Sequence, residues 1–296
     1  MKIIDAHHHL WAPQTPALDV GYVWLKDIGA MKPFGDPTPI QRDYLLPEFL
    51  ENANPHEIIA SVHVQADPRL PDPVAESAFI QKISDESAQP IMIVGFADLK
   101  TDAAAETVQQ HKAHRNLRGI RQILSHLPDR PEISFAATNL LDNPTWRAQF
   151  AALAAQDMRF DLQLYPEQML QAADLIAACP HVPVVIDHLG SPYDQTAAGR
   201  ALWADGMQAL AQIAQVHVKL SGYAMFFQGD LSDGARQVTQ DILTWFGPER
   251  CMFGSNFPVD SLHLAYPDLV DFVASEVGAN ALDAVFANTA ARFYNV

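Results

Sequence analysis

The feature that most constrains the fold is a regular alternation of short apolar runs with helix-like segments. Eight runs are apolar on both faces, as buried parallel strands are, and they cover 2–9, 58–65, 91–97, 117–124, 159–165, 182–188, 216–221 and 251–255. Helical patterning occurs at 72–89, 101–114, 143–156, 166–178, 197–214, 233–246 and 266–293. Eight strand–helix units predict a single closed (β/α)8 TIM barrel rather than an open doubly wound sheet. No GxGxxG or Walker-type loop follows any run, which argues against the nucleotide sites of the open fold.

Length and charge fit one barrel domain over residues 1–296. The net charge of -16, from 35 acidic and 19 basic residues, argues against nucleic acid and against an anionic membrane surface as partners. Two cysteines are too few for a disulfide framework. The N-terminus lacks the apolar core of a signal peptide, and no run is long enough to span a membrane. We therefore expect a cytoplasmic protein with a small-molecule substrate, and we allow for a homodimer.

The first run ends in three consecutive histidines. Because alternate side chains of a strand share a face, Asp5, His7 and His9 are expected on one face and His8 on the other. Two imidazoles on one face at a strand end can bind a metal ion, hold a substrate carbonyl or relay a proton. A solvated cluster, or a structural pair that donates to backbone carbonyls, is the plainer interpretation. The position at the end of a barrel strand favours the functional one.

Further polar side chains gather where the predicted strands end, which is where barrel enzymes carry their chemistry. In chain order they are His63, Gln65, Arg121, Gln122, Asp161, Gln163, Tyr165, Asp187, His188, Lys219, Ser221, Ser255 and Asn256. Since neighbouring residues of a strand point to opposite faces, only one of Arg121 and Gln122 can face the barrel interior.

Several of these charged and polar groups have structural alternatives. Asp161 shares a face with Gln163 and Tyr165, and it could serve only to neutralise Arg121, because a buried charge needs a partner. Gln163 is expected to fill the core. Lys219 could reach the barrel end along its alkyl stem or pair with a carboxylate.

The remaining histidines are interpreted more plainly. His63 shares a face with Gln65 and is expected to be an interior histidine with satisfied hydrogen bonds rather than a metal ligand. Three others are expected to be solvated at the surface: His111, His114 and His181.

Two long irregular stretches, 11–45 and 125–141, are expected to determine the substrate. The first is rich in proline and aromatic residues, among them Trp24. A loop of this length inside a compact domain is typical of a lid over a site. A crossover that merely covers the barrel end is the alternative.

Five short motifs occur in an order that resembles a known family. They are Asp-Ala-His-His-His-Leu-Trp at 5–11, Leu-Arg-Gly-Ile-Arg at 117–121, Val-Ile-Asp-His-Leu-Gly at 185–190, Lys-Leu-Ser-Gly at 219–222 and Met-Phe-Gly-Ser at 252–255. Together with the closing segment 288–294, they are similar to the lactonase-rich branch of the amidohydrolase superfamily. That branch holds sugar-acid lactonases of the fuconolactonase and rhamnonolactonase types and 2-pyrone-4,6-dicarboxylate lactonases. Each motif is weak alone, and the ordered set is specific.

The resemblance implies a hydrolase in which water attacks a lactone carbonyl that histidines polarise. It implies catalytic roles for His7, His9 and His188, a substrate carboxylate or hydroxyl held by Arg121, and a position near the substrate for Tyr165. We add three candidate substrate contacts from the strand ends and the long loop: Gln65, Lys219 and Trp24. Many members of the branch work without a metal and others hold one divalent ion. The cofactor is therefore either none or one Zn or Mn, with His7, His9 and His188 as its ligands.

One position departs from the family pattern, which is usually Gly-Ser-Asp-Trp-Pro and here is Gly-Ser-Asn-Phe-Pro at 254–258. An asparagine amide has no useful basicity, so Asn256 cannot be the general base, although it can orient a water. Asn256 is either an inactivating substitution, part of a natural enzyme that uses another base such as a neutral histidine or a metal-bound hydroxide, or the mark of a binding protein without turnover. Phe257 also departs from the pattern, which favours a natural variant.

Three functions therefore compete. The leading one is a hydrolase that opens the lactone of a sugar acid or related carboxylate. The second is a metal-dependent decarboxylase or C–C hydrolase of the same superfamily, against which Asn256 counts. The third is a non-catalytic barrel that binds a sugar acid.

Overall fold

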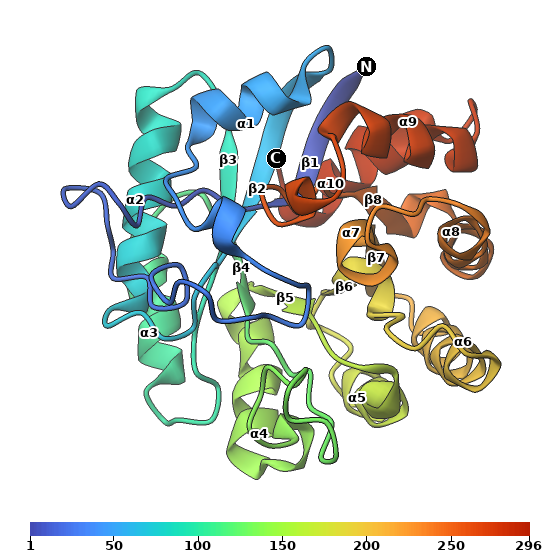
Figure 1. Cartoon of the computed structure of the whole chain (residues 1–296). Helices are drawn as coiled ribbons and strands as arrows, with labels where there is room; N and C mark the ends of the chain where they lie inside the picture. The colour runs from blue at the N-terminus through green and yellow to red at the C-terminus, as the bar shows by residue number, and fades with distance from the viewer.

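The computed structural model describes residues 1–296 and shows eight parallel strands in one sheet, in chain order. They are β1 (Lys2–His8), β2 (Glu57–Val64), β3 (Ile91–Gly95), β4 (Leu117–Arg121), β5 (Arg159–Leu162), β6 (Val184–Ile186), β7 (Val216–Leu220) and β8 (Cys251–Phe253) (Figure 1). The segment after β8 meets the end of β1: the amide of Asn256 donates to the carbonyl of His7 at 2.7 Å, and the amide of His9 donates to that of Phe257 at 2.8 Å. These bonds bring the first and last strands together, so the prediction of a (β/α)8 barrel is confirmed.

Helices surround the strands (Figure 1). They are α1 (Leu46–Ala53), α2 (Pro73–Glu86), α3 (Ala104–His111), α4 (Pro144–Ala152), α5 (Met169–Ala178), α6 (Ala197–Ala211), α7 (Tyr223–Phe227), α8 (Asp233–Phe246), α9 (Tyr266–Val277) and α10 (Thr289–Tyr294). Several begin as their sequences dictate: the side chains of Asp72 and Asn143 accept hydrogen bonds from the first turns of α2 and α4, each with a proline at the start. None of the helices combines the length and apolar character that crossing a membrane requires.

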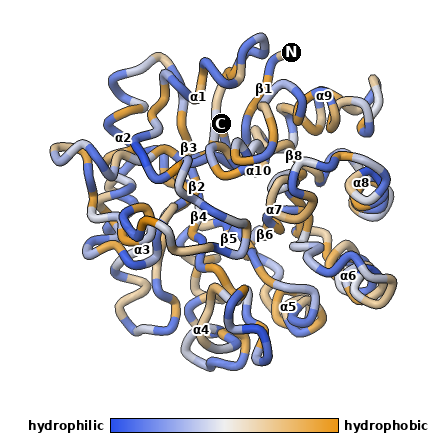
Figure 2. Tube along the Cα trace, viewed as in Figure 1, coloured by the Kyte–Doolittle hydropathy of each residue, from blue (hydrophilic) through white to orange (hydrophobic).

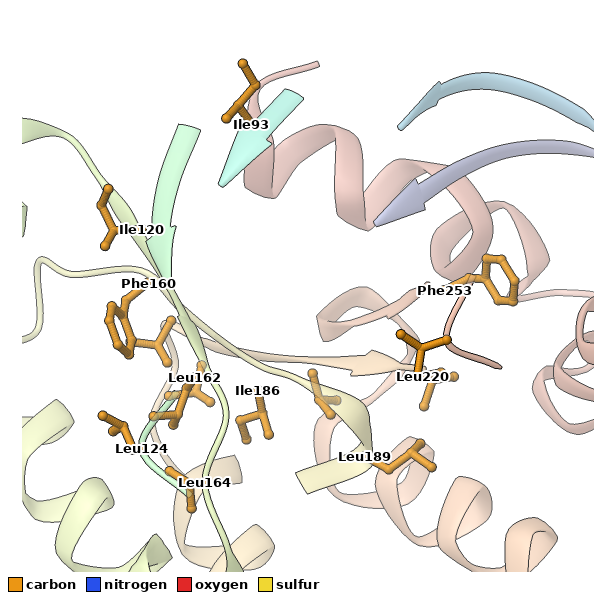
Figure 3. Packing of buried hydrophobic residues seen from close by; sticks show 14 of the residues in the cluster. Ile93, Ile120, Leu124, Phe160, Leu162, Leu164, Ile186, Leu189, Leu220 and Phe253 are labelled. Carbon is orange, nitrogen blue, oxygen red and sulfur yellow. The ribbon is translucent and has the colours of Figure 1, made fainter. Parts of the chain in front are cut away.

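The hydrophobic core has two layers. A large cluster lies between the strands and the helices, and Figure 3 shows part of it around Phe160, Leu162 and Ile186. A second, smaller cluster fills the barrel interior and includes Phe293 and Tyr294 of α10. Along the outer helices, hydrophobic and hydrophilic stretches alternate, as expected of helices with one buried face (Figure 2). Because the C-terminal segment packs near the starts of the strands, the opposite end of the barrel remains for the site.

The alternation of side chains along β1 is interrupted near its end. The register against β2 shifts between Asp5 and His8, so that Ala6 belongs to the interior cluster while Asp5 accepts hydrogen bonds from the hydroxyl of Tyr266 on α9 and from the amide of Ser255. The expectation that Asp5 shares a face with His7 and His9 is therefore wrong. The shift carries the side chain of His7 to the interior.

The predicted strands are mostly longer than the observed ones, and the difference lies at their carboxyl ends. The run 182–188 contains only the three strand residues of β6, and the chain leaves the sheet before His188, where the backbone has a positive φ. The helical patterning predicted over 266–293 corresponds to α9, a π-helical turn and α10.

The segment 11–45 has no strand or α-helix, as expected, and contains one 3-10 turn at Thr38–Ile40. Its ends are joined by a pair of backbone hydrogen bonds between Trp11 and Tyr44, at 2.9 and 3.0 Å. It is therefore a closed loop that returns to its starting point, and in Figure 1 it is the dark blue trace in front of the strands.

Candidate active site

A cavity of about 590 Å³ lies at the carboxyl ends of the strands. Its polar lining residues from near the strand ends include His9, Arg121, Gln163, His188 and Asn256. The long loops 11–45 and 125–141 supply much of the rest of its lining. The volume is in the range of small-molecule sites, and the position is where barrels carry their active sites.

Three histidines converge below and around this cavity. The ring centroid of His7 lies 5.2 Å from that of His9 and 4.4 Å from that of His188. Burial lowers the pKa of His7 and His9 well below the ordinary value, and burial lowers that of His188 to about 3. All three imidazoles are therefore neutral at pH 7.

The Nδ1 atom of each ring already has a neighbour. In His9, Nδ1 lies 2.7 Å from the carbonyl of Val64, which fixes a proton on this atom. In His188 it lies 3.1 Å from Oγ of Ser221, and in His7 it lies 3.3 Å from Asp187. In each ring Nε2 is the atom that remains for a ligand, and in His7 it is buried without a partner.

A network of buried charges supports His7. The ammonium of Lys219 lies 2.5 Å from Asp161, 3.1 Å from Asp187 and 3.2 Å from Nδ1 of His7, and all four side chains are fully buried. The guanidinium of Arg121 lies 3.4 Å from the other oxygen of Asp187. Two carboxylates thus face two cations, and the network is neutral overall.

The protonation of the two carboxylates differs. Burial raises the pKa of Asp161 to about 6. Burial acts in the same direction on Asp187, but Lys219 and His7 outweigh it and hold the pKa of this carboxyl well below its usual range. The alternative that Asp161 neutralises Arg121 is wrong, because its partners are Lys219 and the hydroxyl of Tyr294.

Arg121 is the strand 4 residue that faces the interior. Its guanidinium donates to Gln163 at 3.2 Å and to the carbonyl of Gln65 at 2.5 Å, and Nε has no partner. The side chain of Gln122 points out of the barrel interior, and its amide oxygen accepts bonds from Leu99 and from the indole of Trp146, although the residue still borders the cavity. A guanidinium has five N–H donors, so the bonds described leave Arg121 able to bind an anionic or hydroxylated ligand.

Asn256 sits at a sharp turn after β8, with a φ of 56°. Its amide Nδ2 donates to Oδ1 of Asp260 at 2.8 Å and lies 3.3 Å from the sulfur of Met225. Asp260 is fully buried, and burial raises its pKa to about 7. Asp260 was not expected at the site, although a carboxyl four residues after Asn256 was a signal present in the sequence.

The remaining expected substrate residues lie in different places. Trp24 lines the cavity and donates from its indole to the carbonyl of Ala66. Tyr165 lines a neighbouring cavity of about 230 Å³ that shares Gln163 with the first, and its hydroxyl donates to the carbonyl of Ile133 at 2.6 Å. Gln163 therefore lies between the two cavities rather than only filling the core.

Gln65 and Lys219 are not part of the cavity lining. The side chain of Gln65 is buried without a hydrogen-bond partner, and only its backbone carbonyl reaches Arg121. Lys219 lies beneath the cavity, where its whole environment is the charge network described above.

Two of the other histidines have interior roles. His63 is interior, as expected, and its Nδ1 accepts a bond from the amide of Leu10. The expectation that all its hydrogen bonds are satisfied is wrong, because Nε2 is buried without a hydrogen-bond partner, 3.4 Å from Glu76. His111 was expected at the surface and is instead fully buried between Ser77 and the carbonyl of Phe96. A Cβ on Gly95 would lie 2.7 Å from its ring, so the imidazole fills the space that this glycine leaves.

One cluster of donors fits a metal ion. Ligand atoms of His7, Asp187 and His188 all lie within 4.8 Å of one another. The unpartnered Nε2 of His7 and the carboxylate of Asp187 match the preference of divalent cations such as Zn²⁺ for imidazole and carboxylate. The set differs from the expected one, since Asp187 takes the place of His9. Lys219 is a resident cation at the same carboxylate, so an ion would share it.

Comparisons with known proteins agree with this geometry. A family model described as Amidohydrolase matches residues 4–296. The chain is 32% identical to y4mH of Sinorhizobium fredii over 100% of this chain and 99% of that protein. It is 28% identical to an L-fucono-1,5-lactonase of Burkholderia multivorans over 98% and 95% of the two chains.

A crystal structure of an amidohydrolase from Burkholderia multivorans with bound zinc is similar in fold. It has a TM-score of 0.80 and 26% sequence identity, and the match covers 100% of each chain. The barrel, the cluster of buried histidines at its open end and the family match over nearly the whole length lead to one conclusion: this chain belongs to the amidohydrolase family.

Proposed function

We propose that the protein hydrolyses the lactone ring of a small sugar acid or a related carboxylate. The observation that carries the proposal is the convergence of neutral His9, His188 and cationic Arg121 on one cavity. The similarity to L-fucono-1,5-lactonases supports the same reaction class.

In this proposal His9 takes the proton of the attacking water. Its Nδ1 proton is committed to the carbonyl of Val64, so the lone pair of the ring is on Nε2, on the side of the cavity. Because burial keeps the imidazole neutral at pH 7, this lone pair is available to accept a proton.

In His188 the ring hydrogen and the ring lone pair are on the opposite nitrogen atoms from those in His9. Oγ of Ser221 accepts a bond from the backbone amide of His188 at 3.3 Å, which leaves its own hydrogen for Nδ1 at 3.1 Å. The ring hydrogen then lies on Nε2, and this N–H donates to the lactone carbonyl and to the oxyanion that forms on it.

Arg121 and Asn256 position the reactants. Arg121 binds a carboxylate or hydroxyl of the substrate through its free N–H groups. The amide oxygen of Asn256 accepts a bond from the water and turns a lone pair of that water toward the carbonyl. The water oxygen bonds to the carbonyl carbon as His9 takes its proton, the ring C–O bond breaks, and His9 gives that proton to the ring oxygen, which becomes a hydroxyl. At neutral pH the new carboxylic acid releases one proton per turnover.

If a divalent ion is bound, the proposed ligands are His7, Asp187 and His188. Such an ion would act as a Lewis acid on the carbonyl and lower the pKa of a bound water. Zn or Mn are the metals that we propose to test.

The test is proton release, followed with a pH indicator on a panel of aldonolactones and pyrone-type lactones, before and after treatment with a chelator. We expect turnover, and we expect His188→Ala to lower kcat/KM by roughly 100-fold or more, as removal of an oxyanion donor does. The matched control is His114→Ala, which removes a histidine outside the cavity lining and should leave the rate unchanged.

Each other outcome has a meaning. Full activity in His188→Ala would refute the assignment of roles. Activity lost on chelation and restored by Zn or Mn would place the ion at the proposed ligands. Release of CO₂ from a hydroxybenzoate-type acid would favour the decarboxylase alternative. Thermal stabilisation by a sugar acid without any turnover would favour the binding protein.

A further inference from the structure

Asp260 is a buried carboxyl that the proposed reaction does not use directly. It is fully buried and does not line the cavity. It lies immediately behind Asn256, which does line the cavity. One carboxylate oxygen accepts the Nδ2 hydrogen of Asn256 at 2.8 Å. The other accepts the amide of Ala224, at the start of α7, at 3.2 Å.

We propose that Asp260 is a positioning residue that fixes the amide of Asn256 with its oxygen toward the cavity. The proposal rests on the proposed function, because it assigns the group that orients the attacking water. Asp260 is ionised above its pKa of about 7, and an ionised carboxylate only accepts hydrogen bonds, so the NH₂ end of the amide faces it there. The oxygen end is then turned away from Asp260, and it accepts no hydrogen bond from the protein.

The orientation of the amide matters for the chemistry. A water that donates a hydrogen to the oxygen of Asn256 keeps its lone pairs for the carbonyl carbon. A water that accepts from the NH₂ group instead uses one of the lone pairs with which it would attack. The two ends of a free amide are nearly equal in size, so a partner of fixed polarity is needed to keep the productive one in place.

Backbone hydrogen bonds fix the positions of Asn256 and Asp260, here called the pair, relative to each other. The left-handed conformation of Asn256 turns the chain back, and the amide of Asp260 donates to the carbonyl of Asn256 at 3.0 Å. The amide of Asn256 is itself bonded to the carbonyl of His7, so the pair is attached to the strand that carries the catalytic histidines. Met225, which also contacts Nδ2, lies on the same short helix that Asp260 caps at Ala224.

The pair thus replaces a single strand 8 carboxyl by an amide in the cavity and a carboxylate behind it. This division predicts that the two positions act as a unit. Asn256→Asp alone places two carboxylates in hydrogen-bond contact, where both cannot ionise freely. The double variant Asn256→Asp with Asp260→Asn exchanges the two groups and keeps one donor and one acceptor between the positions.

The kinetic experiment measures kcat and KM for Asp260→Ala, Asp260→Asn, Asn256→Asp and the double variant, with the best lactone of the panel. Loss of one positioning hydrogen bond to a charged group is expected to lower kcat in Asp260→Ala by about 10–100-fold while KM changes by less than about twofold. Asp260→Asn can still accept from Asn256 and should retain more activity than Asp260→Ala. The double variant should be more active than Asn256→Asp.

The matched control is Ser261→Ala, which removes the bond from Oγ to the carbonyl of Pro258 in the same turn and leaves the pair intact. Its kcat should equal that of the wild type. A folded Asp260→Ala protein with unchanged kcat, or a double variant with the simple product of the two single effects, would overturn the proposal.

A second readout does not depend on turnover. In ¹⁵N spectra the side-chain amide of Asn256, assigned by its absence in Asn256→Asp, should show one slowly exchanging hydrogen, and Asp260→Ala should abolish this protection. If the wild type hydrolyses no lactone, the proposed function fails, and the spectra still decide whether Asp260 fixes the amide. Unchanged exchange in Asp260→Ala would refute the positioning role by itself.

Discussion

Replacing Lys219 by methionine tests the buried charge network most sharply. Methionine has nearly the same length and is apolar, so Lys219→Met removes the ammonium with little change in packing. Asp161 then loses its only cationic partner, while Asp187 keeps Arg121 at 3.4 Å. Both carboxylates are fully buried, out of contact with bulk solvent.

The expected cost follows from this burial. Removing one partner of a buried ion pair destabilises a protein by about 3–5 kcal/mol, because the other charge stays buried and uncompensated. For a chain of this size, that loss corresponds to a fall in Tm of about 6–10 °C. The matched control is Lys82→Met, which removes an exposed lysine 3.8 Å from Glu86 and should cost less than about 1 kcal/mol.

The assay is equilibrium unfolding in urea at pH 7 and pH 5. At pH 7 Lys219→Met should lose several times as much stability as Lys82→Met. At pH 5 the difference should shrink, because Asp161, whose pKa is raised to about 6 even beside the ammonium, is then protonated and needs no counter-charge. The double variant with Asp161→Asn should be more stable than Lys219→Met alone. A loss below about 1 kcal/mol at pH 7 would show that the network is not buried as described.

Three further predictions concern the site and its surroundings. Arg121→Gln should raise KM for an anionic lactone by about 10–100-fold. The control is Arg118→Gln on the same strand, where the half-buried arginine is bonded to backbone carbonyls, and it should leave KM unchanged. Equal effects of the two variants would refute Arg121 as the substrate anchor. Tyr193→Ala, which removes an aromatic wall of the smaller cavity, should alter the relative kcat/KM for lactones with long and short substituents by about tenfold, and an unchanged ratio would exclude this cavity from substrate selection. The third concerns acid stability. Histidines with lowered pKa values are His7, His8, His9, His56, His111, His188 and His217. Aspartates with pKa values raised to about 6 or 7 are Asp5, Asp161 and Asp260. Between pH 6.5 and 4 such histidines take up protons on unfolding, and such aspartates release them. Since the histidines are more numerous, the free energy of unfolding should fall as the pH is lowered. Greater stability at pH 5 than at pH 7 would contradict this.

The barrel could be predicted because its evidence is local. Each strand is a short run that is apolar on both faces, and each helix has one apolar stripe, so the order of elements follows from patterns within about fifteen residues. The ends of the strands were less accurate, because the chain leaves the sheet at residues such as His188 and Asn256, whose positive φ values depend on tertiary contacts.

The sequence indicated which residues form the site better than it indicated which of them contact one another. The sequence suggested that Arg121 or Gln122 would face inward, and packing against Trp146 decides which. It did not reveal that Lys219 would lie between Asp161 and Asp187, because these residues come from three different strands. The shift in β1 that separates Asp5 from His7, and the contact of Asp260 with Asn256, also depend on backbone geometry that has no periodic signature.

The measurement that tests the central claim most directly is a product analysis in H₂¹⁸O with a lactone that the enzyme turns over. Attack of water on the carbonyl carbon predicts one ¹⁸O in the new carboxylate and none in the hydroxyl released from the ring. The label should appear only with active enzyme and should be strongly reduced with His188→Ala. Label in the hydroxyl, or loss of CO₂ from the substrate, would contradict a lactone hydrolase of the kind described.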